Sequence, residues 1–432
     1  MDVATQYDVL VIGGGIASAK AAVEAKISDA SDSVAMLSEE PTVYSRTGLT
    51  SVIAGDVQSL DDLTFFPPRV LRNLGIKFLG GYEALTVDHD NQIVQAKKSL
   101  AKTVLRMRYK RLIIATGSIP AVPPIEGSGL PGVFTIKWFE DVLSLSRCLS
   151  PKTRAFVVGA GFVGLETAEA LLKRGARVTI VVRSRILREL IEPDLSQDLK
   201  KRIERKGVKV LTGVSPTEIA GTRKVEHLKL CDEKMPASLV VFATGMAPNI
   251  NIARKAGVRI GGTGAIKVDH GMQTSIPEIY AAGDCAETSD IISGEPVCRP
   301  LGSLAAWTGE VAGANASGAE TSFPGSFRKQ YDNVFGIHIV SMGLSTEEAF
   351  RFGISAEAVD VGTKDSKHDL FSIRTPLDSR MKVIREKGAD VIIGWQVIGH
   401  SRLSARYSLC LEELIRNRGW VSDLQELGLD VP

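Results

Sequence analysis

The chain has 432 residues, and its 52 Lys and Arg against 50 Asp and Glu give a net charge of +2. At roughly 150 residues per domain, this length predicts about three domains with well-buried cores and excludes a small disulfide-stapled scaffold. The balanced charge and the aromatic content of 6% exclude a strongly basic nucleic-acid-binding surface and give no attraction to an anionic membrane.

The five cysteines are scattered, with no C-x-x-C spacing, at positions 148, 231, 285, 298 and 410. This distribution predicts neither a disulfide framework nor a metal site, and it fits a reducing cytoplasm. The start MDVATQYD lacks a basic leader segment. No apolar run approaches the ~18 residues that a membrane span requires. We therefore expect a soluble cytoplasmic protein with no membrane span and no bound metal.

The first predicted unit is a strand, a glycine-rich turn and a helix over residues 7–25, YDVLVIGGGIASAKAAVEA. Its turn resembles G-x-G-x-x-G, with Gly13, Gly15 and Ser18 at the three small positions. One glycine makes the tight turn, the next lets the backbone approach a pyrophosphate, and the third residue lets helix and strand pack closely. The next strand, residues 33–37, ends near Glu39, which is placed to bind ribose hydroxyls. Glu40 is the alternative, and a solvated loop acid is the other interpretation.

Residues 154–172, RAFVVGAGFVGLETAEALL, repeat this pattern with Gly159, Gly161 and Gly164. A single fingerprint is weak evidence, but two copies, each between a strand and a helix, predict two dinucleotide sites in one chain.

The strand over residues 177–182 ends where an acid would bind the 2′-hydroxyl of NAD, but Val182 stands there and is followed by Arg183, Ser184 and Arg185. Arginines suit the 2′-phosphate of NADP through charge-assisted hydrogen bonds. They are equally compatible with a solvated basic loop, and a glycine rather than an alanine at Gly164 favours NADH. The coenzyme preference therefore stays open.

Two short β-rich runs, residues 111–118 (RLIIATGS) and 239–249 (LVVFATGMAPN), end at Thr-Gly and flank the second fingerprint. We therefore predict an α/β fold in which a domain of residues 118–245 is inserted between two parts of another domain, residues 1–117 and 246–325. Predicted strands over residues 334–342 and 390–399 and a helix over residues 403–418 indicate a third, α+β domain over residues 326–432.

The order of these motifs, completed by IYAAGDCAE at residues 279–287, resembles the FAD and NAD(P)H oxidoreductases with two dinucleotide folds, the pyridine nucleotide-disulfide oxidoreductase superfamily. The stretch YSRTGLTS at residues 44–51 resembles Y-x-R-P-x-L-S-K of its ferredoxin, rubredoxin and nitrite reductase flavoproteins, beside the NADH oxidases and coenzyme A disulfide reductases. The resemblance implies two Rossmann-like domains, FAD on the first fingerprint, NAD(P)H on the second, and a C-terminal dimerisation domain.

The resemblance also implies which residues bind the cofactors. For FAD they are Gly13, Gly15, Ser18, Glu39, Arg46, Thr116, Gly117, Gly283 and Asp284. For NAD(P)H they are Gly159, Gly161, Gly164, Glu166, Arg183, Arg185 and Gly245. A helix that starts near Leu301 would direct its positive end at the flavin and stabilise the anionic reduced ring.

The sequence departs from the family at two positions. Thr47 aligns with the nucleophilic cysteine of the single-cysteine branch, and a threonine cannot do thiol redox chemistry. Ser51 stands where the reductase branch has a lysine paired with the glutamate that is here Glu166. We therefore expect Glu166 to have a raised pKa or another partner, and Arg46 is the candidate partner.

These observations predict an FAD-dependent enzyme that takes hydride from NAD(P)H and passes electrons, without a redox cysteine, to an iron–sulfur or rubredoxin-like protein, a quinone or O₂. The catalytic candidates are Glu166, Arg46 and Cys298. Two alternatives stay open. One is a disulfide, coenzyme A disulfide or polysulfide reductase that uses Cys298, a residue otherwise interpreted as a small buried side chain. The other is an NAD(P)H-sensing flavoprotein with a signalling role.

We expect two kinds of protein partner, a second copy of the chain and a small electron-carrier protein. Residues 326–432 would form a symmetric homodimer. The apolar side chains of their strands, part of which belong to the domain's own core, are Ile337, Ile339, Val391, Ile392 and Trp395.

Overall fold

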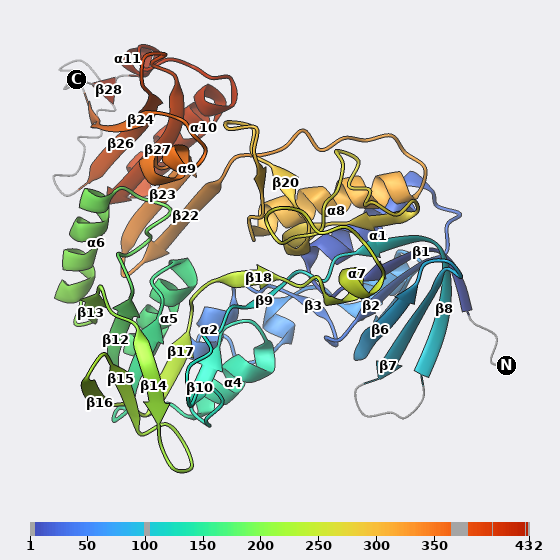
Figure 1. The fold of residues 1–432 in the computed structure, drawn as a ribbon, viewed down its shortest axis with the longest axis horizontal. Coiled ribbons are helices and arrows are strands. Elements are labelled where there is room, and N and C mark those ends of the chain that lie inside the picture. Colours follow the sequence, from blue (N-terminus) through green and yellow to red (C-terminus); the bar gives the residue numbers. More distant parts are fainter. Residues whose placement is uncertain (1–4, 99–103, 364–378, 400, 428, 431–432) are drawn as a thin grey trace.

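The computed structural model describes residues 5–98, 104–363, 379–399, 401–427 and 429–430 (Figure 1). It consists of three large sheets with helices packed against them, joined by short crossing segments. The predicted α/β fold class is confirmed. No helix within the described residues is long and apolar enough to cross a membrane.

The first sheet has the strand order β5-β2-β1-β8-β7-β6, with β19 paired to β8. The strand bounds are β1 (Thr5–Ile12), β2 (Val34–Ser38), β5 (Ile76–Gly80), β6 (Tyr82–Asp88), β7 (Ile93–Lys98), β8 (Val104–Ile114) and β19 (Ile279–Ala281). β1 pairs in parallel with β2 and β8, whereas β6, β7 and β8 form an antiparallel meander. Because β19 pairs in parallel with β8, the chain returns to the first sheet after it has completed the second.

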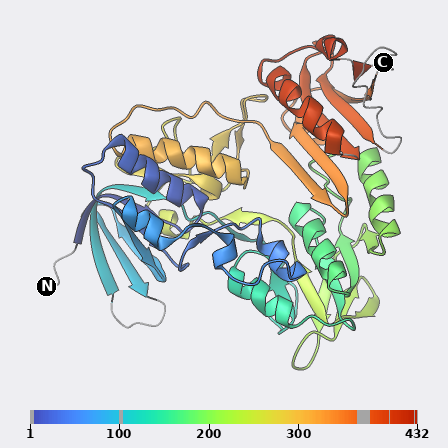
Figure 2. The same ribbon diagram turned by 180° about the vertical axis from the view of Figure 1, so that it is seen from behind.

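Helices α1 (Ile16–Ser28) and α8 (Gly302–Ala316) lie side by side against the first sheet, as the view from behind shows (Figure 2). Their interface is built from small residues. A Cβ on Gly309 would lie 2.4 Å from the Ala17 carbonyl oxygen, and a Cβ on Gly313 would lie 2.2 Å from that of Ala21. The two helices therefore approach each other more closely than any larger side chain would allow.

The second sheet is parallel, in the order β10-β17-β11-β12-β13. Its elements and their neighbours are β10 (Val133–Thr135), α4 (Phe139–Arg147), β11 (Arg154–Val158), α5 (Phe162–Lys173), β12 (Arg177–Val182), α6 (Pro193–Arg205), β13 (Lys209–Thr212) and β17 (Leu239–Phe242). The antiparallel strands β14 (Pro216–Ala220), β15 (His227–Leu230) and β16 (Glu233–Pro236) pack beside it. Apolar runs such as LVVF in β17 suit strands that are buried on both faces.

The third sheet is antiparallel, in the order β22-β23-β27-β26-β24. Its elements are β22 (Lys329–Val334), β23 (Ile337–Gly343), α9 (Thr346–Arg351), β24 (Ala356–Asp360), β26 (Arg380–Glu386), β27 (Ile392–Gly399), α10 (Ser401–Arg416) and α11 (Asp423–Glu426). The predicted strand over residues 334–342 is wrong at its start, because Phe335 and Gly336 turn the chain with positive φ between β22 and β23.

Shorter elements complete the fold. They are β3 (Val43–Tyr44), α2 (Leu49–Ala54), a 3₁₀ turn η1 (Asp61–Leu63), β4 (Thr64–Phe66), α3 (Pro68–Asn73), β9 (Ser118–Pro120), β18 (Met246–Pro248), α7 (Asn251–Lys255), a 3₁₀ turn η2 (Gly283–Cys285), β20 (Thr288–Ser289), β21 (Pro296–Val297), β25 (Gly362–Thr363) and β28 (Leu429–Asp430). β9 and β18 directly follow the two Thr-Gly turns, pair with each other, and run between the first and second sheets (Figure 1). The domain boundaries themselves stay a prediction.

Candidate cofactor and redox site

The first glycine of each fingerprint has the same steric role. Gly13 has φ +143°, and a Cβ there would lie 2.0 Å from the Ala115 carbonyl oxygen just beyond β8. Gly159 has φ +112°, and its Cβ would lie 2.1 Å from the Ala243 carbonyl oxygen just beyond β17. Only glycine fits either turn without moving the neighbouring chain.

The second glycine of each fingerprint faces open space instead. Gly15 and Gly161 are the N-cap residues of α1 and α5, their backbone is extended, and no side chain caps either helix there. A Cβ on either residue would meet no heavy atom within 4 Å. No side chain of the protein therefore caps the start of either helix, and uncapped backbone N–H groups at a helix start are what the binding of a pyrophosphate requires.

The third position differs between the two copies. Ser18 is fully buried, and its hydroxyl donates to the Ala115 carbonyl oxygen at 3.2 Å. In the second copy, a Cβ on Gly164 would lie 2.3 Å from the Gly159 carbonyl oxygen. Helix α5 therefore needs glycine here, whereas the serine fits within the first copy.

The two acids after β2 have different surroundings. Glu40 lies 3.5 Å from the Arg46 guanidinium, whereas burial and the neighbouring carboxylates of Glu83 and Glu40 raise the pKa of Glu39. The structure thus pairs Glu40 with a cation and surrounds Glu39 with like charge.

Arg46 is held by an aromatic cluster. Its guanidinium lies 4.2 Å from the ring centre of Tyr44 and 4.8 Å from that of Trp138. It donates to the Lys137 carbonyl oxygen at 2.8 Å and to the Tyr44 hydroxyl, which in turn accepts the Phe139 N–H at 3.1 Å. These contacts fix the start of the stretch that leads into α2.

Glu166 has partners other than Arg46. The Thr50 hydroxyl of α2 donates to its carboxylate at 3.2 Å, and Asp332 of β22 lies against the same carboxyl group. Burial, with Asp332 as the next cause, raises the pKa of Glu166 to about 8. Of the two expected outcomes the raised pKa is found. The expectation that Arg46 replaces the missing lysine is wrong, because the described contacts of Arg46 are to Tyr44, Trp138, Lys137 and Glu40.

The Gly-Asp turn adds a polar group that the sequence did not reveal. The Ser118 hydroxyl donates to Asp284 at 2.7 Å, and Lys137 Nζ lies 3.1 Å from Ser118 Oγ and 4.0 Å from Asp284 Oδ2. Burial lowers the pKa of Lys137. Lys137 follows β10 in no recognisable motif, so only the fold brings it to Asp284.

The glycine of this turn is also constrained. Gly283 has φ +76°, a Cβ there would lie 2.8 Å from Ala17 Cβ, and its N–H donates to the Thr308 hydroxyl of α8 at 3.0 Å. The turn is therefore locked between α1 and α8, with Asp284 presented beside the first fingerprint.

The Thr-Gly turns serve the crossing strands. The Thr116 hydroxyl donates to the Asn249 carbonyl oxygen at 2.6 Å, and the Asn249 N–H donates to the Gly117 carbonyl oxygen at 2.8 Å. Gly117 and Gly245 both have positive φ, and neither would bring a Cβ into contact with another residue. A Cβ at either turn would thus face open space.

Neither cysteine near the Gly-Asp turn has the properties of a thiolate. Cys298 is half-buried, its thiol donates to the Asp284 carbonyl oxygen at 3.5 Å, and burial raises its pKa to about 11. Burial also raises the pKa of the fully buried Cys285. Arg299 does not lower the pKa of Cys298, because its guanidinium binds Asp290 and Glu348.

The loop after β12 contains the two arginines predicted to bind a 2′-phosphate. Arg185 donates to the Ile191 carbonyl oxygen at 2.5 Å and to Glu347 of α9 at 3.0 Å. Within the described part of the chain, the Arg183 side chain has no hydrogen bond or ion pair. The structure therefore leaves Arg183 available and engages Arg185 elsewhere.

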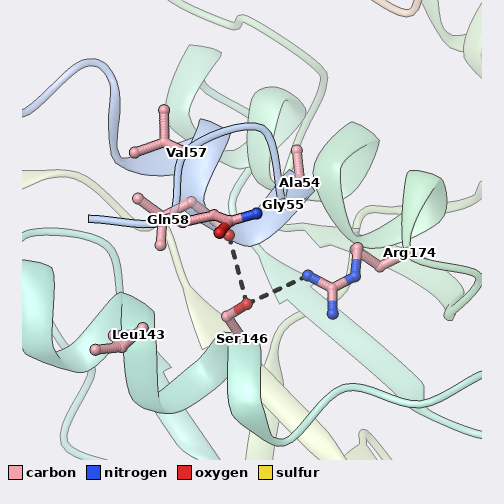
Figure 3. Close-up of a pocket in the computed structure, with 8 residues that line it drawn as sticks. Ala54, Gly55, Val57, Gln58, Leu143, Ser146 and Arg174 are labelled. Carbon is pink, nitrogen blue, oxygen red and sulfur yellow. Dashed lines mark hydrogen bonds between the residues drawn. The ribbon is translucent and has the colours of Figure 1, made fainter. Parts of the chain in front are cut away.

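A cavity of about 470 Å³ lies between α2, α4 and the end of α5 (Figure 3). Arg174 donates there to the Ile53 carbonyl oxygen and the Ser146 hydroxyl, and that hydroxyl donates to the Val52 carbonyl oxygen at 3.4 Å. None of the predicted cofactor residues lines this cavity. Among the described residues, no cluster of three His, Cys, Asp or Glu side chains is arranged to hold a metal.

Comparison with known proteins supports the same family. Residues 7–306 match the family model described as pyridine nucleotide-disulphide oxidoreductase. The chain is 31% identical over 402 residues to an NADH oxidase of Methanocaldococcus jannaschii, covering 92% of this chain and 88% of that protein. It is 31% identical over 396 residues to an NAD(P)H coenzyme A polysulfide/persulfide reductase of Pyrococcus horikoshii, covering 90% of this chain and 87% of that protein.

A solved structure has the same fold. The NAD-dependent persulfide reductase from A. fulgidus superposes with a TM-score of 0.90 at 30% sequence identity, covering 96% of this chain and 78% of that one. The chain therefore belongs to the pyridine nucleotide-disulphide oxidoreductase family and is an FAD-containing, NAD(P)H-dependent oxidoreductase.

Proposed function

We propose that this enzyme passes electrons from NAD(P)H through its flavin directly to an acceptor, without a protein thiol in the electron path. One observation carries this proposal: the thiol of Cys298, the half-buried cysteine beside the Gly-Asp turn, donates a hydrogen bond to the Asp284 carbonyl oxygen at 3.5 Å, and burial raises its pKa to about 11. A thiolate nucleophile requires the opposite environment. Thr47, at the position aligned with the family's cysteine, lies 3.0 Å from the Ser45 hydroxyl and has no thiol chemistry.

The residues at the two fingerprints fit the two nucleotides. Gly13, Gly15, Ser18, Glu39, Arg46, Thr116, Gly117, Gly283 and Asp284, with Lys137 in addition, would hold FAD. Gly159, Gly161, Gly164, Glu166, Arg183 and Gly245 would hold NAD(P)H, and Arg185 contributes only if its bond to Glu347 opens. FAD, when bound, supplies the hydride acceptance and electron release. Glu166, with its raised pKa, would hold a proton beside this site at neutral pH.

We propose an iron–sulfur or rubredoxin-like protein, a quinone or O₂ as the acceptor. O₂ is supported by the similarity to an NADH oxidase. The remaining sequence predictions belong to the same proposal: an NAD(P)H domain of residues 118–245 inserted in an FAD domain, a homodimer through residues 326–432, and a cytoplasmic location.

A polysulfide or coenzyme A disulfide reductase that uses Cys298 is the second candidate. It is supported by the similarity to proteins named as persulfide reductases. A flavoprotein that only senses NAD(P)H would differ from both candidates in its low turnover with artificial acceptors.

The test is anaerobic reduction of the purified holoprotein with NADH or NADPH, followed by mixing with ferricyanide, a quinone, O₂ or a disulfide. Cys298→Ala should retain ferricyanide activity, as should the control Cys148→Ala, which removes an exposed thiol. A robust wild-type disulfide activity that disappears in Cys298→Ala alone would establish the second candidate. If NAD(P)H reduces the flavin rapidly but no acceptor reoxidises it faster than the buffer without acceptor does, the result would favour the sensing role.

A further inference from the structure

The loop that follows β12 is tied to helix α9 of the C-terminal sheet by one carboxylate. Glu347 accepts a hydrogen bond from Arg185 Nη2 at 3.0 Å. It also accepts two from Arg188, from Nε at 2.9 Å and from Nη2 at 2.5 Å. One carboxylate thus engages two arginines of the loop whose position makes it the discriminator between NADH and NADPH.

Buried hydrogen bonds hold the loop and α9 in the positions that bring Glu347 to its two arginines. The Glu192 carboxylate, which is buried, accepts the Thr346 N–H at 2.9 Å and the Thr346 hydroxyl at 2.6 Å. The Glu192 N–H donates to the Gln396 side chain of β27 at 2.7 Å. These hydrogen bonds fix the end of the loop directly beside the start of α9. The carboxylate of Glu347 is therefore held close to Arg185 and Arg188 by the surrounding structure. Isolated surface ion pairs lack this advantage.

Arg185 also has a second anchor. Its Nη1 donates to the Ile191 carbonyl oxygen at 2.5 Å, a bond within the loop itself. If Glu347 lost its charge, this bond would keep the guanidinium at the loop while one donor edge and a full positive charge became available. Arg183 lies two residues before Arg185 in the same loop, so the loop would then carry two available cations.

We propose that Glu347 is a coenzyme-selectivity residue: its carboxylate occupies the guanidinium donors of Arg185 and Arg188 that a 2′-phosphate would otherwise use. It thereby lowers the affinity for NADPH and leaves that for NADH unaffected. The inference rests on the proposed binding of NAD(P)H at the second fingerprint. It explains how an arginine-rich loop can discriminate against a phosphate, since the positive charges are already neutralised within the protein.

The test compares Glu347→Gln with wild type and with Glu357→Gln as a matched control. Glu357 lies in β24 of the C-terminal sheet and accepts hydrogen bonds from one arginine, Arg385 of β26, whose Nε is at 2.9 Å and whose Nη2 is at 2.8 Å, so it does not contact the loop after β12. The probes are adenosine 2′,5′-bisphosphate and adenosine 5′-monophosphate, titrated into the holoprotein by calorimetry. Neither probe carries a nicotinamide, so the measurement is independent of turnover.

Glu347→Gln should tighten the binding of adenosine 2′,5′-bisphosphate by about fivefold, the scale for removing one nearby charge from a partly solvated site. Binding of the monophosphate should not change, and Glu357→Gln should match wild type with both probes. The KM for NADPH should fall by the same factor while that for NADH stays constant. The double variant Glu347→Gln with Arg185→Met should lose most of the gain.

Unchanged bisphosphate affinity in a folded Glu347→Gln would overturn the inference, as would an equal gain for both probes. Glu347→Ala provides a second arm, because it removes the same carboxylate without leaving an amide in its place. If wild type binds neither probe and its flavin is reduced by neither coenzyme, the proposed function itself fails, which is a separate result.

Discussion

The glycines of the first fingerprint serve two different physical purposes, although they lie only two positions apart. Gly13 has a positive φ and a carbonyl oxygen where its Cβ would be, so it is required by the protein's own turn. Gly15 has an extended backbone that any residue can adopt, and a Cβ there would meet no protein atom within 4 Å. The protein's own packing therefore does not require glycine at this position, and the missing side chain leaves open space next to the backbone. Gly159 and Gly161 repeat this division in the second copy.

This division predicts that substitutions at different glycines have different effects: loss of FAD, loss of reduction by the coenzyme, or loss of folding. Gly15→Val should fold and yield colourless protein, because its side chain would fill the space that we propose for the pyrophosphate of FAD. Gly161→Val should stay yellow and be reduced by dithionite but not by NADH or NADPH. Gly13→Ala should fail to fold, since the added carbon meets the Ala115 carbonyl. Absorption spectra and circular dichroism check all three, and a full flavin spectrum in Gly15→Val would contradict the assignment.

The raised pKa of Glu166 predicts that the stability of the protein depends on pH. Its pKa is about 8 in the folded protein, mainly because of burial and then because of Asp332, whereas an unfolded glutamate titrates near ~4.3. Between these values the folded state holds more protons, so the free energy of unfolding falls as the pH rises, by at most about 1.4 kcal/mol per pH unit. The penalty is complete above the folded pKa.

Glu166→Gln should remove this slope and become more stable relative to wild type as the pH rises. Asp332→Asn should lower the pKa of Glu166 and so narrow the pH range over which the free energy of unfolding falls. Urea unfolding of the holoprotein at several pH values gives the measurement, with Glu140→Gln on the exposed side of α4 as the control. Parallel curves for wild type and Glu166→Gln would show that the carboxyl group is ionised at neutral pH.

At the scale of elements, the contact between α1 and α8 joins two segments that lie far apart in the sequence. Gly309 and Gly313 lie one helical turn apart and place the α8 backbone directly on the carbonyls of Ala17 and Ala21. The same contact locks Gly283 of the Gly-Asp turn, whose N–H donates to Thr308 of α8. Packing of the two helices therefore positions Asp284 beside the first fingerprint.

Gly313→Ala should destabilise the protein by about 1–3 kcal/mol, the usual cost of overpacking a tight interface. It should also weaken FAD retention, because α1 carries the first fingerprint. Thermal melting and the fraction of FAD lost on gel filtration measure the two effects. Gly129→Ala is the control, since its Cβ would meet no atom within 4 Å. Equal stability of the two variants would mean that the helices can move apart at little cost.

At the scale of the whole molecule, a buried ion cluster joins the segment before α8 to the C-terminal sheet. Arg299 binds Asp290 at 2.5 Å and Glu348 at 3.0 Å, and Arg328 binds Glu348 at 2.6 Å. All four side chains are at most 9% exposed. Burial lowers the pKa of Arg328, whose charge depends on Glu348.

Glu348→Gln should therefore destabilise the protein by about 3–5 kcal/mol, since it leaves buried guanidinium groups without that carboxylate. Glu357→Gln, which breaks a more exposed pair with Arg385, should cost about 0–1 kcal/mol. Urea unfolding of both variants provides the comparison. Similar costs would mean that water or rearrangement compensates the buried arginines.

The expected homodimer needs a surface other than the apolar strand residues named for it. Ile337, Ile339, Val391, Ile392 and Trp395 are all at most 8% exposed and belong to the chain's own cores. The exposed large apolar side chains in the described C-terminal part are Tyr331, Phe350, Leu409 and Trp420. Light scattering at micromolar concentration should give the mass of a dimer, and Leu409→Glu should shift it toward a monomer. A monomeric wild type would contradict the prediction.

The sequence by itself determined what depends on neighbouring residues. Apolar runs, a turn that needs glycine and a following helix are local features, so both fingerprints, the α/β class and the crossings at Thr-Gly could be read from short stretches. The missing lysine at Ser51 likewise predicted the raised pKa of Glu166, because burial penalises an unpaired carboxylate in any fold.

Only the tertiary structure decided which side chains meet across long distances in the chain. Asp332 reaches Glu166 from the third sheet, Glu347 engages Arg185, and Lys137 approaches Asp284. Each pairing follows from how separate sheets pack, and no spacing or composition records that packing. The sequence therefore predicts which turns bind the nucleotides, whereas the folded chain decides which charged side chains near those turns are already paired with each other.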